Sequence, residues 1–206
     1  MTDIWPAVHA ERAALAADLV SLTDDQWHLA TECPAWDVHD MLAHLVSAAS
    51  INPPKFVTRL ATSGFNFDKY ANREVQREGA GGPAATLQRF NQLLDSTTAP
   101  PGPKPTWLGE VVVHADDIRR AVGIPHTYKT EDLTNVLEFY AKSNPIIHGR
   151  DRVAGLTMKA TDADVSVGSG EVVEGPLLAL VRATTGRRSA LDELSGPGVD
   201  TLRARS

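Results

Sequence analysis

Ionisable side chains with the spacing of metal ligands stand out in one segment of the chain. Glu110 and His114 lie four residues apart in a stretch of helical periodicity, and Asp117 follows one turn later. At about 100° per residue, these residues share a narrow stripe at the border of the apolar face. A glutamate and a histidine spaced in this way can direct a carboxylate oxygen and an imidazole nitrogen at one point. The pattern therefore favours one half of a metal site.

His44 is the candidate that would complete this metal site. It belongs to an expected helix at about 38–50 and lies just beside the apolar arc of that helix. Two histidines and a glutamate from two helices leave a coordination position open, as in catalytic zinc sites. Ferrous iron and nickel accept the same donors. Asp117 would then support the ligands from behind or act as a cap.

A structural interpretation of the same residues stays open at this point. Glutamate and histidine four residues apart also form weak side-chain pairs on solvated helix faces. Other chemistries have less support: Cys33, the only cysteine, has no neighbouring base, and no Gly-x-Ser-x-Gly motif occurs. The glycine-rich stretches 79–82 and 168–170 lack the lysine or third glycine of phosphate-binding loops and are interpreted as turns.

Helices are the elements that must position these candidates. Apolar periodicity and capping residues predict helices at 5–22, 38–50, 68–78, 83–95 and 107–122. A proline-rich connector at 97–105 carries no packing of its own. Helices joined by short links indicate an antiparallel bundle.

The sequence changes character after about Thr130, where strand patterns appear among the helices. Alternation with a period of two predicts a hairpin of strands at 155–161 and 163–168. The helical segments expected around it are 133–143, 177–185 and a final turn at 189–194. We therefore predict a mainly α protein, with a helical bundle at 1–128 and a small α+β domain at 129–206.

Charge and composition exclude several classes of partner. The 206 residues include 20 basic and 26 acidic side chains, for a net charge of -6, and no long basic run occurs. Nucleic acid and anionic lipid are therefore not expected partners. The chain shows no signal-peptide pattern, no apolar stretch long enough to span a membrane and no cysteine pair for a disulfide. We expect a cytoplasmic protein that is a monomer or a homodimer.

Two segments resemble a known family. The residues 31–45 (TECPAWDVHDMLAHL) and 110–123 (EVVVHADDIRRAVG) resemble the mycothiol-dependent maleylpyruvate isomerase family, which belongs to the DinB-like metal-binding bundles. The resemblance implies a four-helix bundle in which His44, Glu110 and His114 hold a divalent metal, typically zinc. The region from 175 to 199 is similar to the end of a sterol-carrier-type domain, which many family members carry at the C-terminus.

The resemblance also implies a reaction. Mycothiol or a related low-molecular-weight thiol would bind the open metal position and lose its proton there, since metal coordination stabilises the thiolate. Attack of that metal-bound thiolate on a small electrophile, followed by rotation and elimination, would give isomerisation, whereas attack on another electrophile would give S-transfer. Arg187 is the expected catalytic cation, and Asn72 and Arg73 are the expected contacts of the thiol cofactor.

Two other functions remain in view. One is a bundle that binds a metal or a small molecule without turnover. The other is a structural bundle whose metal triad is vestigial. Stoichiometric metal separates the last alternative from the others, and thiol-dependent product formation separates an enzyme from a binding protein.

Overall fold

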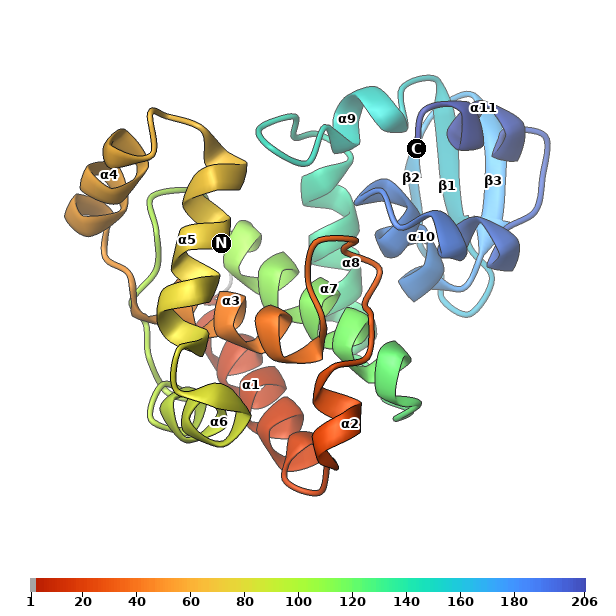
Figure 1. Ribbon diagram of the computed structural model, residues 1–206. Coiled ribbons are helices and arrows are strands. Elements are labelled where there is room, and N and C mark those ends of the chain that lie inside the picture. Colours follow the sequence, from red (N-terminus) through yellow and green to blue (C-terminus); the bar gives the residue numbers. More distant parts are fainter. Residues whose placement is uncertain (1–2) are drawn as a thin grey trace. The chain divides into compact units, whose positions relative to one another are not determined.

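The computed structural model describes residues 3–206. The chain divides into two units, and the boundary in the sequence lies between His126 and Thr127. The first unit is helical, and the second combines helices with a three-stranded sheet (Figure 1). This confirms the predicted fold class, a mainly α protein with a small α+β part at the C-terminus.

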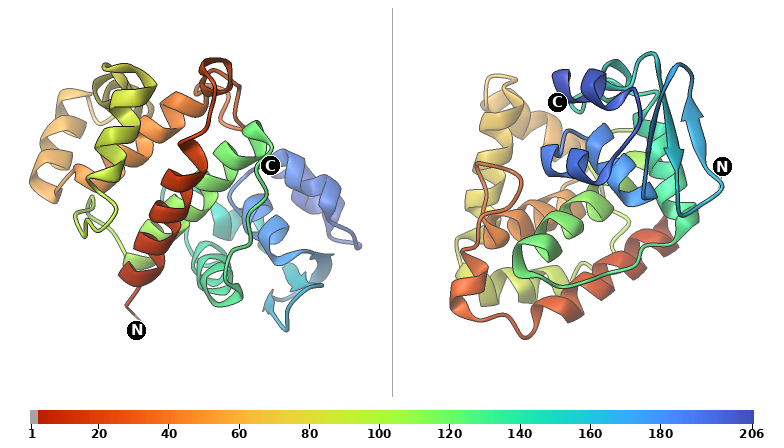
Figure 2. Two further views of the ribbon diagram at one scale, coloured as in Figure 1. Left: turned by 90° about the horizontal axis from the view of Figure 1, so that it is seen from below. Right: turned by 90° about the vertical axis from the view of Figure 1, so that its right-hand side faces the viewer.

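The first unit is built around a long helix that carries Glu110 and His114. Helices α1 and α7 run side by side (Figure 2), and α3 packs against α5, α6 and α7. The elements of this unit are α1 (Trp5–Leu19), α2 (Asp24–Trp27), α3 (Val38–Ser50), α4 (Pro53–Thr62), α5 (Phe67–Gly79), α6 (Gly82–Asn91) and α7 (Lys104–Val122).

Local sequence signals set the ends of these helices. The Asp37 carboxylate accepts a hydrogen bond of 2.8 Å from the backbone amide of Asp40 and so caps α3. Asn52 and Asn66 cap α4 and α5 in the same way. Gly123 ends α7 in the left-handed conformation, with a φ of 73°, which glycine adopts without steric cost.

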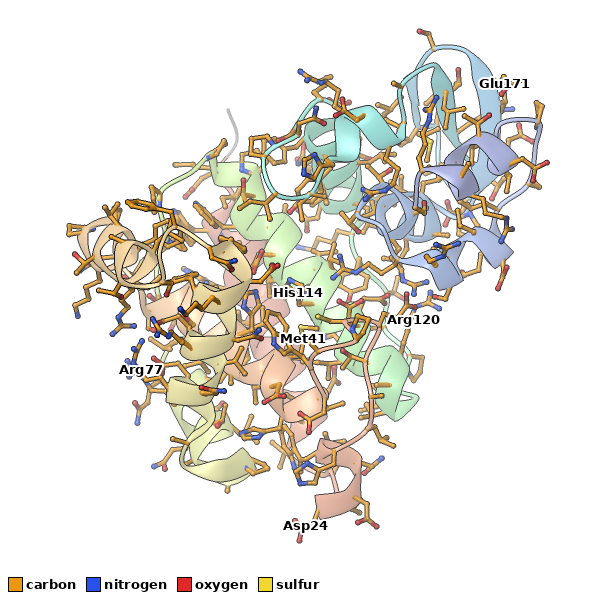
Figure 3. All side chains as sticks on the ribbon, turned by 45° about the horizontal axis from the view of Figure 1, so that its top comes forward. Asp24, Met41, Arg77, His114, Arg120 and Glu171 are labelled. Carbon is orange, nitrogen blue, oxygen red and sulfur yellow. The ribbon has the colours of Figure 1, made fainter. Side chains whose placement is uncertain are left out.

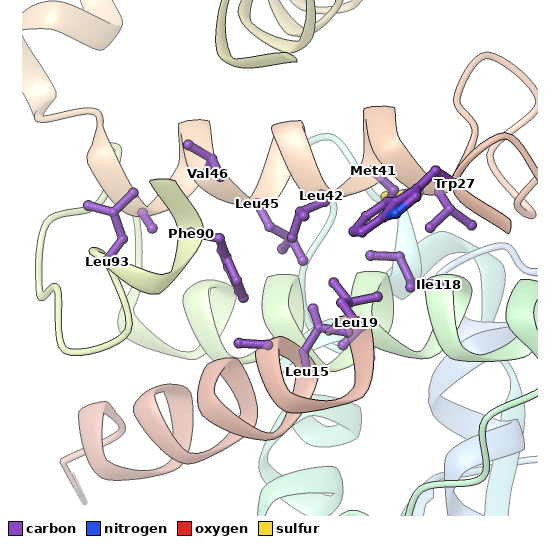
Figure 4. Close-up of a cluster of buried hydrophobic side chains, with 14 residues drawn as sticks. Leu15, Leu19, Trp27, Met41, Leu42, Leu45, Val46, Phe90, Leu93 and Ile118 are labelled. Atoms are coloured by element: carbon purple, nitrogen blue, oxygen red, sulfur yellow. The ribbon is translucent and has the colours of Figure 1, made fainter. Parts of the chain in front are cut away.

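An apolar core fills the space between α1, α3, α6 and α7 (Figure 4). Within each helix, its members lie three or four residues apart, so each helix contributes one buried stripe. The largest fully buried side chains of this cluster are Leu15, Leu19, Met41, Leu42, Phe90 and Ile118. This core holds α3 and α7 together, and these are the two helices with the candidate ligands.

Helix α4 lies at residues 53–62, for which no helix was predicted. Pro53 ends the preceding helix as expected, yet it also begins α4, because proline fits the first turn of a helix when a residue such as Asn52 caps it. Pro105 likewise lies in the first turn of α7, although no side chain caps that helix, so the predicted connector 97–105 is too long. Helix α1 ends three residues earlier than predicted, at Leu19.

In the second unit, the predicted hairpin is present, and it is part of a larger sheet. Strand β1 is the middle strand, antiparallel to β2 and parallel to β3. Helix α10 packs against α8 and against β1. The elements of this unit are α8 (Thr130–Tyr140), α9 (Gly149–Arg152), β1 (Leu156–Ala160), β2 (Ser166–Gly168), β3 (Glu171–Gly175), α10 (Leu177–Thr184), the 3-10 helix η1 (Arg188–Glu193) and α11 (Val199–Ala204).

The parallel strand β3 and helix α11 were not predicted. Strand β3 forms through pairing with β1, in which Met158 lies opposite Val173. Gly170 makes the turn before β3 possible, because its φ is +125° and a Cβ there would lie 2.0 Å from the carbonyl oxygen of Gly155. Across residues 3–206, no helix is both long enough and apolar enough to cross a bilayer.

The buried stripe of α1 gives a test of the core. We expect Leu15→Ala to lower the free energy of unfolding by about 2–5 kcal/mol, because Leu15 is 0% exposed and the change leaves a cavity. The matched control is Leu29→Ala, whose side chain is 39% exposed and for which we expect about 1 kcal/mol or less. Chemical denaturation of both variants measures the difference. Equal losses would show that the core is not packed as described.

Candidate functional site

His44 of α3 meets Glu110 and His114 of α7 at the surface of the first unit. The Nε2 atom of His44 hydrogen-bonds Oε1 of Glu110, and Nε2 of His114 lies 3.6 Å from the same oxygen. The two imidazole rings meet edge to face, with centroids 4.9 Å apart. The three side chains are 14%, 23% and 16% exposed, respectively. The structure therefore brings together all three candidate ligands from two distant parts of the sequence.

The geometry of these atoms suits one divalent cation. One ligand atom from each of the three residues lies within 4.8 Å of the other two. Ligands at the usual 2.0–2.2 Å from a tetrahedral zinc ion stand roughly 3.3–3.6 Å from one another. Two imidazole nitrogens and one carboxylate oxygen are donors that zinc, ferrous iron and nickel accept. This donor set therefore fits the metal that the sequence analysis expected.

Asp117 supports this group from the interior of the unit. Nδ1 of His114 donates a hydrogen bond of 3.2 Å to Oδ2 of Asp117, whose side chain is fully buried. This contact fixes the tautomer of His114, so that its Nε2 carries a lone pair toward Glu110 and His44. Carboxylate groups commonly orient metal-binding histidines in this way. Figure 3 shows His114 among the side chains of α7.

Trp36 forms one wall of the site. Its ring lies against His44, with centroids 4.7 Å apart and a tilt of 32°. The indole nitrogen donates a hydrogen bond of 2.8 Å to Oδ1 of Asn72 on α5. Asn72 is thus linked to the site through Trp36. The indole shields one side of the His44 ring from water.

A second group of possible metal donors has a simpler explanation. Asp37, His39 and Asp40 also hold ligand atoms within 4.8 Å of one another. The Asp37 carboxylate, however, caps α3 and contacts Nδ1 of His28, while Nε2 of His39 is 2.9 Å from the hydroxyl of Thr86. Burial lowers the pKa of His39, with smaller opposing effects from the two aspartates. Asp37 is therefore already used to cap α3, and His39 to link α3 to α6.

The other two predicted site residues lie in different places. Arg73 of α5 donates from Nη1 to the carbonyl oxygen of Thr62, at 2.9 Å, and to Oγ of Ser63. Arg187 belongs to the second unit, where it precedes η1 and donates to the carbonyl oxygen of Thr185. Burial, and secondly the charge of Arg187, lower the pKa of Arg152. Two guanidinium groups therefore make this part of the second unit positive.

One polar cluster was missed entirely by the sequence analysis. Glu74 of α5 is 2% exposed and forms ion pairs with both Arg59 and Arg77. No motif marks these residues, because charged side chains occur on every side of α5 and only the fold shows which of them is buried.

Comparison with known proteins places this site in a family. The family model described as the mycothiol maleylpyruvate isomerase N-terminal domain matches residues 8–119. The chain belongs to the mycothiol maleylpyruvate isomerase family. The matched part includes α3 and α7, and therefore His44, Glu110 and His114. No curated protein sequence matches the chain.

Solved structures show the same fold along nearly the whole chain. Two crystal structures of the mycothiol-dependent maleylpyruvate isomerase, one of them of a mutant, give TM-scores of 0.63 and 0.64. In both, the identity is 15%, with 94% of this chain and 91% of the other chain covered. The second unit, which lies beyond the family model, is thus included in the structural similarity of this family member.

Proposed function

We propose that this family member is a divalent-metal-dependent enzyme that uses mycothiol or a related low-molecular-weight thiol. Its reaction would be isomerisation of a small electrophile or S-transfer to it. The convergence of His44, Glu110 and His114, with Asp117 behind them, is the observation that carries the proposal. Family membership supports the thiol, and the donor set supports zinc, with ferrous iron and nickel as alternatives.

The residues of the site have separate roles in this proposal. A divalent cation held by His44, Glu110 and His114 would lower the pKa of a coordinated thiol, so that the sulfur is a thiolate at neutral pH. Asp117 keeps Nε2 of His114 available by holding the proton on Nδ1. Trp36 keeps water from one side of His44 and orients its ring.

Ligand recognition is assigned to three further residues. Arg187 is proposed to bind an anionic group of the electrophile, because the nearby Arg152 adds a second positive charge. Asn72 is proposed to contact the thiol cofactor from the wall that it shares with Trp36. Arg73 is also proposed as a ligand contact, although its guanidinium reaches toward the end of α4.

Metal content is the first test. We expect purified protein to hold about one zinc or other divalent ion per chain, and His44→Ala to lose most of it, since three donors are reduced to two. His39→Ala is the matched control, because His39 lies on the same helix and bonds Thr86. Elemental analysis measures both variants. Unchanged metal in His44→Ala, or equal loss in the control, would contradict the site.

The role of Asp117 gives a second test. We expect Asp117→Asn to weaken zinc binding by about 10–100-fold, because the amide no longer favours the proton on Nδ1 of His114. The substitution keeps the size of the buried side chain, so the fold should persist. Competition with a chelating dye measures the affinity, and circular dichroism checks the fold. Zinc affinity equal to that of the unsubstituted protein would show that Asp117 does not position His114.

Turnover is tested with the metal-loaded protein. Incubation with mycothiol and a panel of small electrophiles should give a product that requires both thiol and metal. We expect Arg187→Gln to lower kcat/KM by about tenfold or more, because a charged hydrogen bond to the substrate is lost. Arg188→Gln is the control, since Arg188 is exposed and bonds the carbonyl oxygen of Ser206. A metal-loaded protein without any thiol-dependent product would favour the alternative of a non-catalytic binding bundle.

A further inference from the structure

The helices α4 and α5 form an open cavity of about 400 Å³. Among its lining residues, only Arg73 has a role in the proposed function. Arg59 and Thr62 line it from α4, and Arg73, Glu74 and Arg77 line it from α5. With three positive side chains and one negative, its formal charge is +2, in a chain whose net charge is -6. The cavity is therefore a positive site on an acidic protein.

The buried Glu74 carboxylate lies between two of these arginines. Nη1 of Arg59 contacts one carboxylate oxygen of Glu74, and Nη1 of Arg77 contacts the other. Two guanidinium groups are thus held on either side of one carboxylate. Each guanidinium carries five N–H donors in a planar fork and uses a single nitrogen on Glu74. Among the described residues, Glu74 is the one hydrogen-bond partner observed for either guanidinium, and both side chains line the cavity and are partly exposed.

Arg73 provides the third positive group and does not pair with Glu74. Its Nη1 bonds Thr62 and Ser63 at the end of α4, which draws the guanidinium across the cavity. Arg73 and Arg77 are four residues apart and lie on the same side of α5. In Figure 3, Arg77 and His114 lie on opposite sides of α5. The cavity is lined from α4 and α5, whereas the candidate metal ligands come from α3 and α7.

We propose that this cavity binds a phosphate group of a small metabolite. A phosphomonoester carries a charge of about -2 at neutral pH, which balances the formal charge of the cavity, and it concentrates its oxygens on one atom. Planar guanidinium forks match that geometry. The proposal is independent of the metal, because none of the candidate metal ligands lines the cavity. Arg73 is the one lining residue that the proposed function also assigns to ligand contact.

Calorimetric titration with inorganic phosphate and with glycerol phosphate tests the proposal. We expect saturable binding of one phosphate group per chain at fixed ionic strength. Arg73→Gln should weaken it by about tenfold or more, since charge-assisted hydrogen bonds are lost. Arg73→Lys keeps the positive charge and should restore part of the affinity. The matched control is Arg89→Gln on α6, which should leave the affinity unchanged because Arg89 is exposed and bonds Gln92.

The outcomes separate this site from the metal site. Titration of the protein as purified and again after chelation should give the same phosphate affinity, because phosphate bound to a metal ion would be lost on chelation. In the unsubstituted protein, phosphate should change the NMR chemical shifts of the backbone amides of α4 and α5. This measurement does not depend on whether a variant folds. The absence of saturable binding, succinate that binds as tightly as phosphate, or equal effects of Arg73→Gln and Arg89→Gln would overturn the proposal.

Discussion

Close packing of α3 against α7 is the constraint on which the candidate site depends. His44 comes from one helix and Glu110 and His114 from the other, so neither helix alone carries the full set of donors. Leu45 and Ile118 belong to the same buried core and keep the two helices in register. A slip of one helical turn displaces a side chain by about 5.4 Å, which exceeds the reach of a metal bond. The apolar core and the polar site are therefore parts of one arrangement.

The register of α7 is fixed from its other side as well. Arg119 is 1% exposed, and its Nε donates a hydrogen bond of 2.8 Å to Asp18 of α1, while Glu11 of the same helix lies 3.6 Å from its Nη1. Glu11 also contacts His126, just beyond the end of α7. Buried ion pairs add little net stability, but loss of one partner is costly, so such groups favour a single alignment of the helices. One face of α7 is thus anchored to α1, and another carries the donors.

Local signals explain which elements could be predicted. The cap and periodicity of α3 lie within the helix, so it was predicted over its full length, whereas α7 was predicted without its first three residues, 104–106, which the proline-rich sequence concealed. Strand β3 depends on pairing with β1, and α4 begins at prolines that also end α3, so neither has a self-contained signal. In the site, spacing indicated Glu110 with His114, and the position of His44 beside the apolar arc of its helix made it the third candidate. The family resemblance then favoured these three residues as one set. Nothing in the sequence indicated that Glu74 is buried between arginines.

Helix α5 contributes to both the wall of the candidate metal site and the arginine-lined cavity, because its faces have different neighbours. Asn72 accepts a hydrogen bond from the indole of Trp36, which precedes α3 and lies against His44, while Arg73 bonds the end of α4. Adjacent residues of a helix differ by about 100° in direction, so a single residue step moves from one environment to the other. A ligand between α4 and α5 would order that pair without touching the metal donors. Helix α5 also packs directly against α3, so the hydrogen bond from Trp36 to Asn72 is one of several contacts that connect this helix to the candidate site.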